Sequence, residues 1–136
     1  MGTIAGWIAA FLFTQAIEIP IYVRAQRGSP ASPTLSGRVA TAFGASAITH
    51  PVVWFVMPAA ADAIFLWMAR HGLRSLVAGD TFRWLAFGVL AEGFAVAVEA
   101  LYLRAMRVPR PWSWALVANF ASASLGYVSF RLTGWP

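Results

Sequence analysis

Apolar residues run through the chain in four long stretches, each interrupted by only a few polar side chains. These stretches cover residues 3–23, 39–57, 84–104 and 112–131. A helix needs about 20 mostly apolar residues to cross a bilayer, so each stretch predicts a membrane-spanning α-helix. The pattern therefore predicts an all-α integral membrane protein, a four-helix transmembrane bundle.

Residues 58–83 give a less regular pattern than the four stretches. This segment begins apolar, carries Asp62 and becomes polar at Arg70. Pro58 lacks a backbone donor, so it bends or ends a helix. We therefore expect the second span to end at residue 57 or to extend to residue 70. Residues 64–76 then form either the tail of that span or an amphipathic helix at the membrane surface.

Composition agrees with a chain embedded in a membrane. Of 136 residues, 60% are hydrophobic and 11% are charged, which is too little polar surface for a soluble domain. We expect residues 1–136 to form a single transmembrane domain. The sequence contains no cysteine, which excludes disulfides, thiol redox chemistry and cysteine metal sites.

The arginines predict how the helices are oriented. Six of the ten lie near residues 24–38 and 104–110 without any acid, and the other four are diluted by Asp80. Basic loops stay on the cytoplasmic side, so both termini should be non-cytoplasmic, in a cell membrane such as a bacterial inner membrane. Because these arginines lie at span ends, we expect membrane lipids and not nucleic acid as their partners.

Three carboxylates lie inside apolar stretches, where they need an explanation. Glu18 is in the first stretch, and Glu92 and Glu99 are seven residues apart in the third, on one face of a helix. A charge at bilayer depth costs about 3 kcal/mol on insertion scales, so such residues usually face a bundle interior. We therefore expect all three side chains to point inward.

Two more polar residues fall at compatible depths. His50 precedes Pro51 in the second stretch, and Asn119 lies in the fourth. The candidate ion- or proton-binding residues are therefore Glu18, His50, Glu92, Glu99 and Asn119. Hydrogen bonds that buried carboxylates require are expected from five neighbours at similar depth: Thr14, Gln15, Ser46, Thr49 and Ser122. An intramembrane histidine can also be a plain interhelical contact, a metal or pigment ligand, or a base.

The two halves of the chain resemble each other. EIPIYVRA from Glu18 matches EALYLRA from Glu99, and FGASA from Phe43 matches FASAS from Phe120 more weakly. Two helical hairpins of the same orientation would form a parallel repeat about an axis along the membrane normal, as in some transporters. The fold prediction therefore includes duplicated, parallel-oriented hairpins.

No catalytic or cofactor motif accompanies these residues, and we assign neither a cofactor nor a metal. The first functional hypothesis is proton- or cation-handling transport, which would need a homo-oligomer because four spans rarely enclose a pathway. The second is an accessory or structural subunit of a larger membrane complex. The third is an intramembrane hydrolase, in which Glu92 or Glu99 activates water and His50 with Asn119 stabilises the developing charge.

Overall fold

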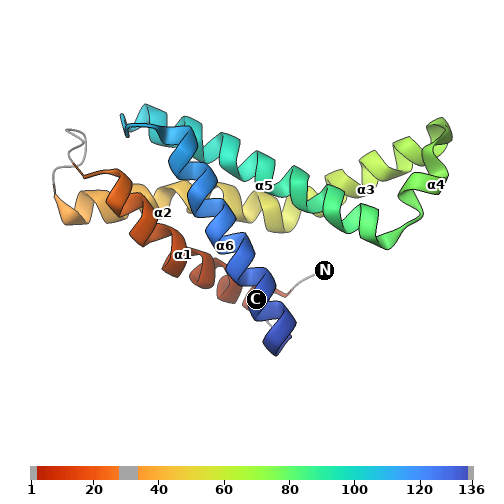
Figure 1. Ribbon diagram of the computed structural model, residues 1–136, viewed down its shortest axis with the longest axis horizontal. Coiled ribbons are helices and arrows are strands. Elements are labelled where there is room, and N and C mark those ends of the chain that lie inside the picture. Colours follow the sequence, from red (N-terminus) through yellow and green to blue (C-terminus); the bar gives the residue numbers. More distant parts are fainter. Residues whose placement is uncertain (1–2, 28–33, 135–136) are drawn as a thin grey trace.

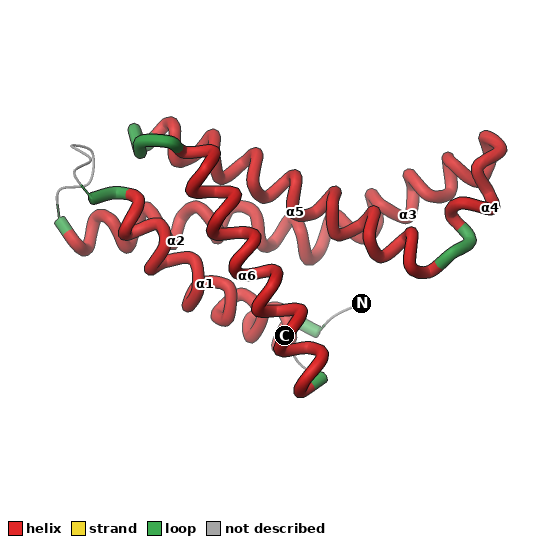
Figure 2. Tube along the Cα trace, viewed as in Figure 1, coloured by secondary structure: helices red, strands yellow, loops and turns green. Residues whose placement is uncertain are grey.

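The computed structural model describes residues 3–27 and 34–134, which form helices and short turns with no strand among them (Figures 1 and 2). In chain order the elements are α1 (Ile4–Ala25), α2 (Leu35–Pro51), the π-helical turn η1 (Val52–Val56), α3 (Met57–Met68), a second π-helical turn η2 (Ala69–Leu73), α4 (Arg74–Val77), α5 (Asp80–Ala105) and α6 (Pro111–Thr133). Part of the basic loop expected near residues 24–38 lies outside the described residues.

Threonine caps fix the starts of the first two helices. Thr3 Oγ1 accepts a hydrogen bond from the Gly6 amide at 3.1 Å, and Thr34 Oγ1 accepts one from the Gly37 amide at 3.1 Å. Such caps satisfy amides that have no partner within the helix. The second helix therefore begins at Leu35, four residues before the predicted start at residue 39.

The sequence predicts that the second helix ends at residue 57 or extends to residue 70, and helical geometry continues past residue 57 until His71 and Gly72, which separate it from the short helix α4. Pro51 and Pro58 each remove a backbone donor, and the turn between them widens so that the Met57 amide bonds to the Val52 carbonyl. The expected break thus becomes a π-helical turn. Helical geometry is lost at His71 and at Gly72, where φ is +88°, a conformation that glycine adopts without steric cost.

The turn between α5 and α6 is tight and packed. Arg107 adopts a left-handed conformation, and the Val108 amide bonds to the Leu103 carbonyl at 2.9 Å. Val108 and Leu103 are both buried in one core cluster, which is the hydrophobic contact that accompanies this type of helix end. Pro111 then occupies the first turn of α6, where its missing amide costs nothing.

Four helices surround a common interior. α1 packs against α2 and α6, and α5 packs against α2 and α6. Figure 1 shows α2 continuing into α3, which lies along the first half of α5 and extends away from α1 and α6. Gly126 lies near Phe13, and Ser122 bonds to Glu18, so α1 and α6 are antiparallel and both chain ends lie at one end of the structure.

Small residues fill the interior, and large apolar residues cover the outside. Ten of the fifteen buried hydrophobic residues in the described part are alanines. Leu12, Val89 and Phe120 are 60–73% exposed. Close approach of helices over small residues is typical of membrane bundles, where lipid covers the larger side chains.

Three helical segments are long and apolar enough to cross a membrane: Ile4–Ala25, Leu35–Val77 and Asp80–Ala105. The fourth span predicted at residues 112–131 corresponds to α6, which is not among these three although it has 23 residues. The structure is therefore all-helical, with three candidate spans, and is compatible with a membrane location.

Candidate functional site

Glu18 lies at the centre of the interior, with only 1% of its surface exposed. The Ser122 hydroxyl of α6 donates to Glu18 Oε1 at 2.6 Å, and the Ser46 hydroxyl of α2 donates to Oε2. Both carboxylate oxygens therefore have a partner, as buried polar atoms require.

Glu99 of α5 is equally buried and receives three hydrogen bonds. Thr49 Oγ1 donates to Oε1 at 2.7 Å, and Asn119 Nδ2 donates to Oε2 at 2.8 Å. The third donor is the hydroxyl of Tyr22, a wholly buried side chain of α1. Glu99 thus connects three other helices, α1, α2 and α6.

Helical spacing lets each donor helix reach both carboxylates. Ser46 and Thr49 are three residues apart on α2, as Asn119 and Ser122 are on α6, so each pair lies on one helix face. From each pair one side chain donates to Glu18 and the other to Glu99. The two acids therefore share a single hydrogen-bond network.

None of these five donors carries a positive charge. The ion pair found between described residues joins Arg83 to Asp62 at 2.8 Å, and neither residue lines the carboxylate cavity. A buried charge without a counter-charge is costly even when it is hydrogen-bonded. Two adjacent carboxylates with neutral partners therefore favour the binding of a proton or a small cation.

A cavity of about 140 Å³ adjoins the two carboxylates. All five residues predicted as site members contribute to its walls: Glu18, His50, Glu92, Glu99 and Asn119. Thr14, Ser46, Thr49 and Ser122, predicted as hydrogen-bonding neighbours, also line it. Gln15 does not line the cavity, and its amide instead donates to the Phe43 carbonyl at 3.2 Å.

The cavity extends from the carboxylates in one direction. Along α1 its walls run from Glu18 back to Ala10, and along α6 they run from Asn119 forward to Gly126. Both directions lead to the end of the structure that carries the chain termini. Water or ions could reach the carboxylates from that end.

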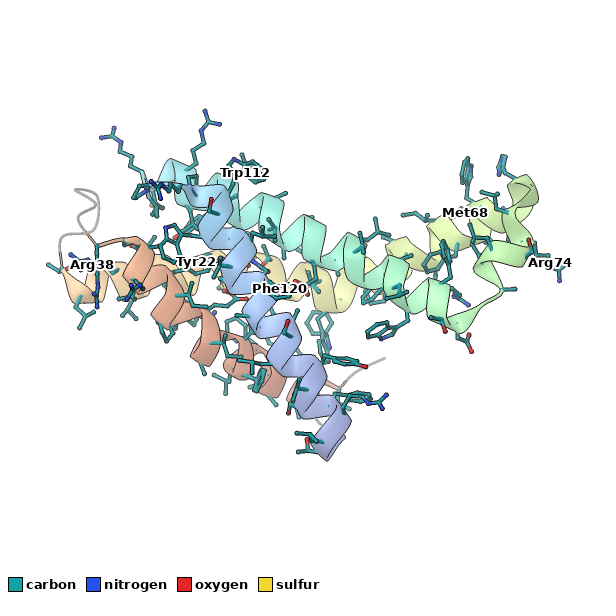
Figure 3. The ribbon with its side chains drawn as sticks, in the orientation of Figure 1. Tyr22, Arg38, Met68, Arg74, Trp112 and Phe120 are labelled. Atoms are coloured by element: carbon teal, nitrogen blue, oxygen red, sulfur yellow. The ribbon has the colours of Figure 1, made fainter. Side chains whose placement is uncertain are left out.

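A packed layer lies on the other side of the carboxylates. Tyr22, labelled in Figure 3, and Leu103 are fully buried there, among alanines of all four surrounding helices. These alanines are Ala25, Ala42, Ala45, Ala100, Ala115 and Ala118. Neither Tyr22 nor Leu103 lines the carboxylate cavity, so this layer separates that cavity from the opposite end.

His50 forms part of an aromatic wall of the cavity. Its ring centroid lies 5.3 Å from that of Phe11 and 6.3 Å from that of Trp54, whose ring is stacked at 13°. Nδ1 of His50 is buried and has no hydrogen-bond partner among the residues that the structure describes. His50 is thus near the carboxylates without being bonded to either.

Glu92 lies in a different setting from Glu18 and Glu99. Its side chain borders the cavity but is exposed, and it makes no hydrogen bond or ion pair within the described part of the chain. Glu92 lies two turns before Glu99, where α5 moves away from α1 and α6 (Figure 1). It therefore lies at the edge of the cavity, outside the hydrogen-bond network.

Tyr22 is the site residue that sequence reasoning missed. It lies four residues after Glu18, on the same helix face, but its hydroxyl bonds to Glu99 on another helix. The spacing could have marked Tyr22 as an inward residue, whereas which of the two carboxylates its hydroxyl bonds to depends on packing.

Comparison of the chain with protein-family models, curated proteins and solved structures gives no match.

Proposed function

We propose that this protein binds a proton or a small monovalent cation between Glu18 and Glu99 and passes it across a membrane. The observation that carries the proposal is the pair of buried acids held only by neutral donors. Such a pair lowers its energy by taking up one positive charge. The adjoining cavity supplies a route to it from one end.

The hydroxyl groups of the network suit repeated binding and release. Ser46, Thr49 and Ser122 donate to a carboxylate, and each hydroxyl can rotate to accept from a protonated acid or to ligate a cation instead. Glu92 and His50, at the cavity wall, would guide the ion toward the buried pair. Release toward the other end then requires movement of the layer that contains Tyr22 and Leu103.

Four membrane spans fit this function, with α6 as the fourth. The α6 helix has 23 residues and runs antiparallel to α1, with Ser122 at the depth of Glu18. A helix that reaches the depth of the carboxylates beside α1 would cross the same layer of the bilayer. Both termini would then lie on one side, which the loop arginines predict to be non-cytoplasmic.

The hydrogen-bond network also favours a duplicated hairpin. If Glu18 corresponds to Glu99, then Ser46 corresponds to Asn119, and Thr49 to Ser122, and these two pairs share one offset in sequence. The same offset pairs four fully buried alanines, Ala42 with Ala115 and Ala45 with Ala118. This alignment differs from the match of FGASA with FASAS, which would pair Ser46 with Ala123.

Helix ends support the same duplication. The Gln26 amide bonds to the Tyr22 carbonyl at the end of α1, and the Met106 amide bonds to the Tyr102 carbonyl at the end of α5. In each helix the next amide bonds to the carbonyl of the arginine in Tyr-x-Arg-Ala. Equivalent sequence thus gives equivalent helix ends, as a parallel repeat requires.

The other two hypotheses have less support. In the hydrolase hypothesis Asn119 helps to stabilise the developing charge, but both of its amide hydrogens are used, by Glu99 and by the Ala115 carbonyl. An accessory subunit would use its outer faces for partners, and it gives no reason for two buried acids. A homo-oligomer stays part of the transport proposal.

Proteoliposomes test the proposal directly. The parent protein should carry protons or Na⁺ down an imposed gradient, and Glu99→Gln should lower that flux at least tenfold because an amide keeps most hydrogen bonds but cannot take up the charge. Asp80→Asn, which makes the same change at an exposed acid, should keep the flux. Absence of flux in the parent, or parent-like flux in Glu99→Gln with unchanged folding, would refute the proposal.

A further inference from the structure

The part of the structure beyond the carboxylate cavity forms an arm, which we define as α3, η2, α4 and residues 80–90 of α5. It has its own small core of Ala61, Phe65 and Val77. Figure 1 shows this arm extending away from α1 and α6. Its surfaces are not used by the proposed ion site, so they call for a separate explanation.

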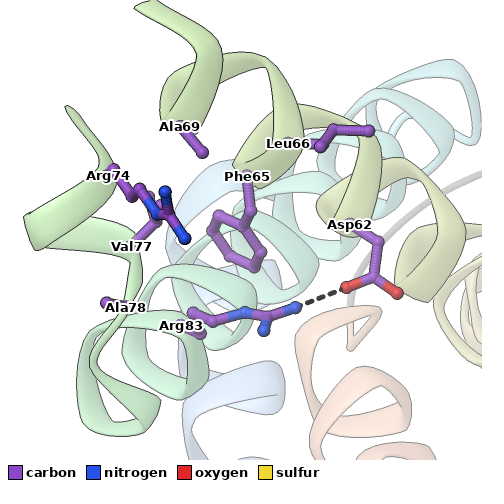
Figure 4. Close-up of a pocket in the computed structure, with 8 residues that line it drawn as sticks. All are labelled: Asp62, Phe65, Leu66, Ala69, Arg74, Val77, Ala78 and Arg83. Atoms are coloured by element: carbon purple, nitrogen blue, oxygen red, sulfur yellow. Dashed lines mark hydrogen bonds and ion pairs between the residues drawn. The ribbon is translucent and has the colours of Figure 1, made fainter. Parts of the chain in front are cut away.

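A pocket of about 420 Å³ lies at the end of the arm, and Figure 4 shows the residues that line it. Two cationic side chains, Arg74 of α4 and Arg83 of α5, project toward it with the single acid Asp62. Arg83 donates to Asp62 at 2.8 Å, so these two charges neutralise each other. Arg74 has no ion-pair partner within the described part of the chain, and the pocket is therefore net positive.

An apolar groove of about 360 Å³ lies beside this pocket, between α3 and α5. Its walls run along α5 from Phe82 to Leu90 and along α3 from Ile64 to Met68, with no charged residue among them. The groove thus leads from the end of the arm toward the middle of α5. A flexible hydrocarbon chain would fill such a groove without leaving any polar group unpaired.

Phe65 connects the pocket and the groove because its side chain lines both. The Arg83 guanidinium carbon lies 5.2 Å from the centroid of the Phe65 ring, within the range of a cation–π contact. Arg83 is thereby held beside the junction of the cationic pocket and the apolar groove. A ligand that occupied both would need a negative head directly joined to an apolar tail.

The arm carries the residues expected where headgroups meet hydrocarbon. Trp67 and Trp84 are 58% and 61% exposed, and tryptophan is enriched at this level of a membrane. Arg70 is exposed on the same arm, close in sequence to Arg74. Arginines near an anionic lipid surface are attracted to it.

We propose that the arm binds one anionic phospholipid, with its phosphate at Arg74 and Arg83 and an acyl chain in the α3–α5 groove. Arginine suits this head because its planar guanidinium can donate two hydrogen bonds to phosphate oxygens. Arg83 retains donors besides the one that bonds to Asp62. Asp62 holds Arg83 in place while Arg74 supplies the unbalanced charge. Zwitterionic lipids have no net negative charge, so this pocket would bind them less tightly.

Retention of lipid by the purified protein tests this proposal. The protein would be purified from mixed vesicles of phosphatidylglycerol and phosphatidylcholine with identical acyl chains, and bound lipid counted by native mass spectrometry. We expect phosphatidylglycerol to be retained at least fivefold over phosphatidylcholine, and Arg74→Gln to reduce this preference about fivefold. Equal retention of both lipids by the parent would overturn the proposal.

Controls separate a specific site from general charge. Arg131→Gln removes an exposed arginine near the C-terminal end of α6, outside the arm. This variant should keep the preference for phosphatidylglycerol. An equal loss in both arginine variants would mean that only net charge matters, which would refute the site. Free inorganic phosphate should not displace the lipid, because it cannot fill the groove, and displacement by phosphate would likewise contradict the proposal.

The groove needs its own variant. Ala86→Phe places a ring in the groove wall, and we expect it to reduce lipid retention, whereas Ala63→Phe on the exposed side of α3 should not. Arg74→Gln keeps the test decisive if Ala86→Phe does not fold, since Arg74 is exposed. Parent-like retention in a folded Ala86→Phe variant would exclude the groove as the acyl-chain site.

Discussion

At the scale of single residues, the site is unusual in relying on neutral donors. Glu18 and Glu99 together receive five hydrogen bonds, from hydroxyl and amide groups only. Arginine or lysine in these positions would neutralise the acids permanently, whereas hydroxyl groups orient them and leave the charge uncompensated. Under the proposed function, an ion would therefore bind and leave without breaking a salt bridge.

The hydroxyl of Tyr22 gives a test of this network. In Tyr22→Phe the ring still fills the core, but Glu99 keeps only Thr49 and Asn119 as donors. We expect the free energy of unfolding in mild detergent to fall by about 1 to 3 kcal/mol, the cost of losing a buried hydrogen bond.

Tyr127→Phe provides the matched control, because Tyr127 is 49% exposed. It should change the free energy of unfolding by less than about 0.5 kcal/mol, as for most surface substitutions. Equal effects of the two substitutions would show that the Tyr22 bond contributes nothing specific.

Residue identity and spacing by themselves predict part of this site. An acid in an apolar stretch must find polar partners, and this rule places Glu18, Glu99 and Asn119 at one cavity wall. Glu92 lines the same cavity but is exposed and lies outside the hydrogen-bond network. The helix face can be read from the sequence, but the divergence of the helices depends on how they pack.

At the scale of elements, α2 and α5 are in close contact at Gly44 of α2 and Tyr102 of α5. A Cβ atom added at Gly44 would lie 2.5 Å from the Tyr102 hydroxyl and 3.2 Å from Cζ of that ring. We expect Gly44→Ala to lower the free energy of unfolding by about 1 to 3 kcal/mol, as overpacking does. Adding Tyr102→Phe should recover part of this loss because the closest atom is removed.

Gly88→Ala is the control for Gly44→Ala, since a Cβ there meets nothing within 4 Å. Alanine is favoured over glycine inside a helix by about 0.5 to 1 kcal/mol, so this variant should be neutral or more stable. Chemical denaturation would measure the free energy of unfolding of Gly44→Ala, Tyr102→Phe, the double variant and Gly88→Ala. Additive effects of Gly44→Ala and Tyr102→Phe would show that the two residues are not in contact.

Element boundaries are harder to predict than the existence of the helices. Apolar length alone predicts the four main helices, because about 20 apolar residues favour a helix in lipid. The sequence leaves open whether the second helix stops at residue 57 or extends to residue 70, since prolines normally interrupt a helix, and here Pro51 and Pro58 enclose a π-helical turn and helical geometry continues until His71. Whether a proline breaks or widens a helix depends on partners such as α5, which packs along α3.

At the scale of the whole molecule, the carboxylates lie between an open side and a closed side. The cavity extends toward the chain termini, and the alanine-rich layer with Tyr22 and Leu103 lies toward the loop at residues 106–110. A protein that moved ions across the membrane would have to open this layer after an ion had entered from the cavity side. One-sided access is therefore the property that distinguishes this arrangement from a continuous pore.

Single cysteines can measure this access, because the chain has no cysteine of its own. A maleimide that cannot cross membranes reacts only with thiols in contact with water, where the thiolate forms. Ala123→Cys, in the cavity wall, should react when the reagent is applied to the side of the termini. Ala118→Cys, in the closed layer and fully buried, should react at least tenfold more slowly.

Two further positions show whether the difference is due to the cavity or to the membrane. Phe120 is 72% exposed on the outer face of α6 (Figure 3), so Phe120→Cys should be unreactive if lipid covers this face. Met106→Cys, in the turn after α5, should react only from the opposite side to Ala123→Cys.

Reaction of Ala123→Cys in intact cells would place the termini outside the cytoplasm, and reaction only in inverted vesicles would reverse the orientation. Equal rates for Ala118→Cys and Ala123→Cys would disprove the closed layer, because water would then reach both sides of the carboxylates.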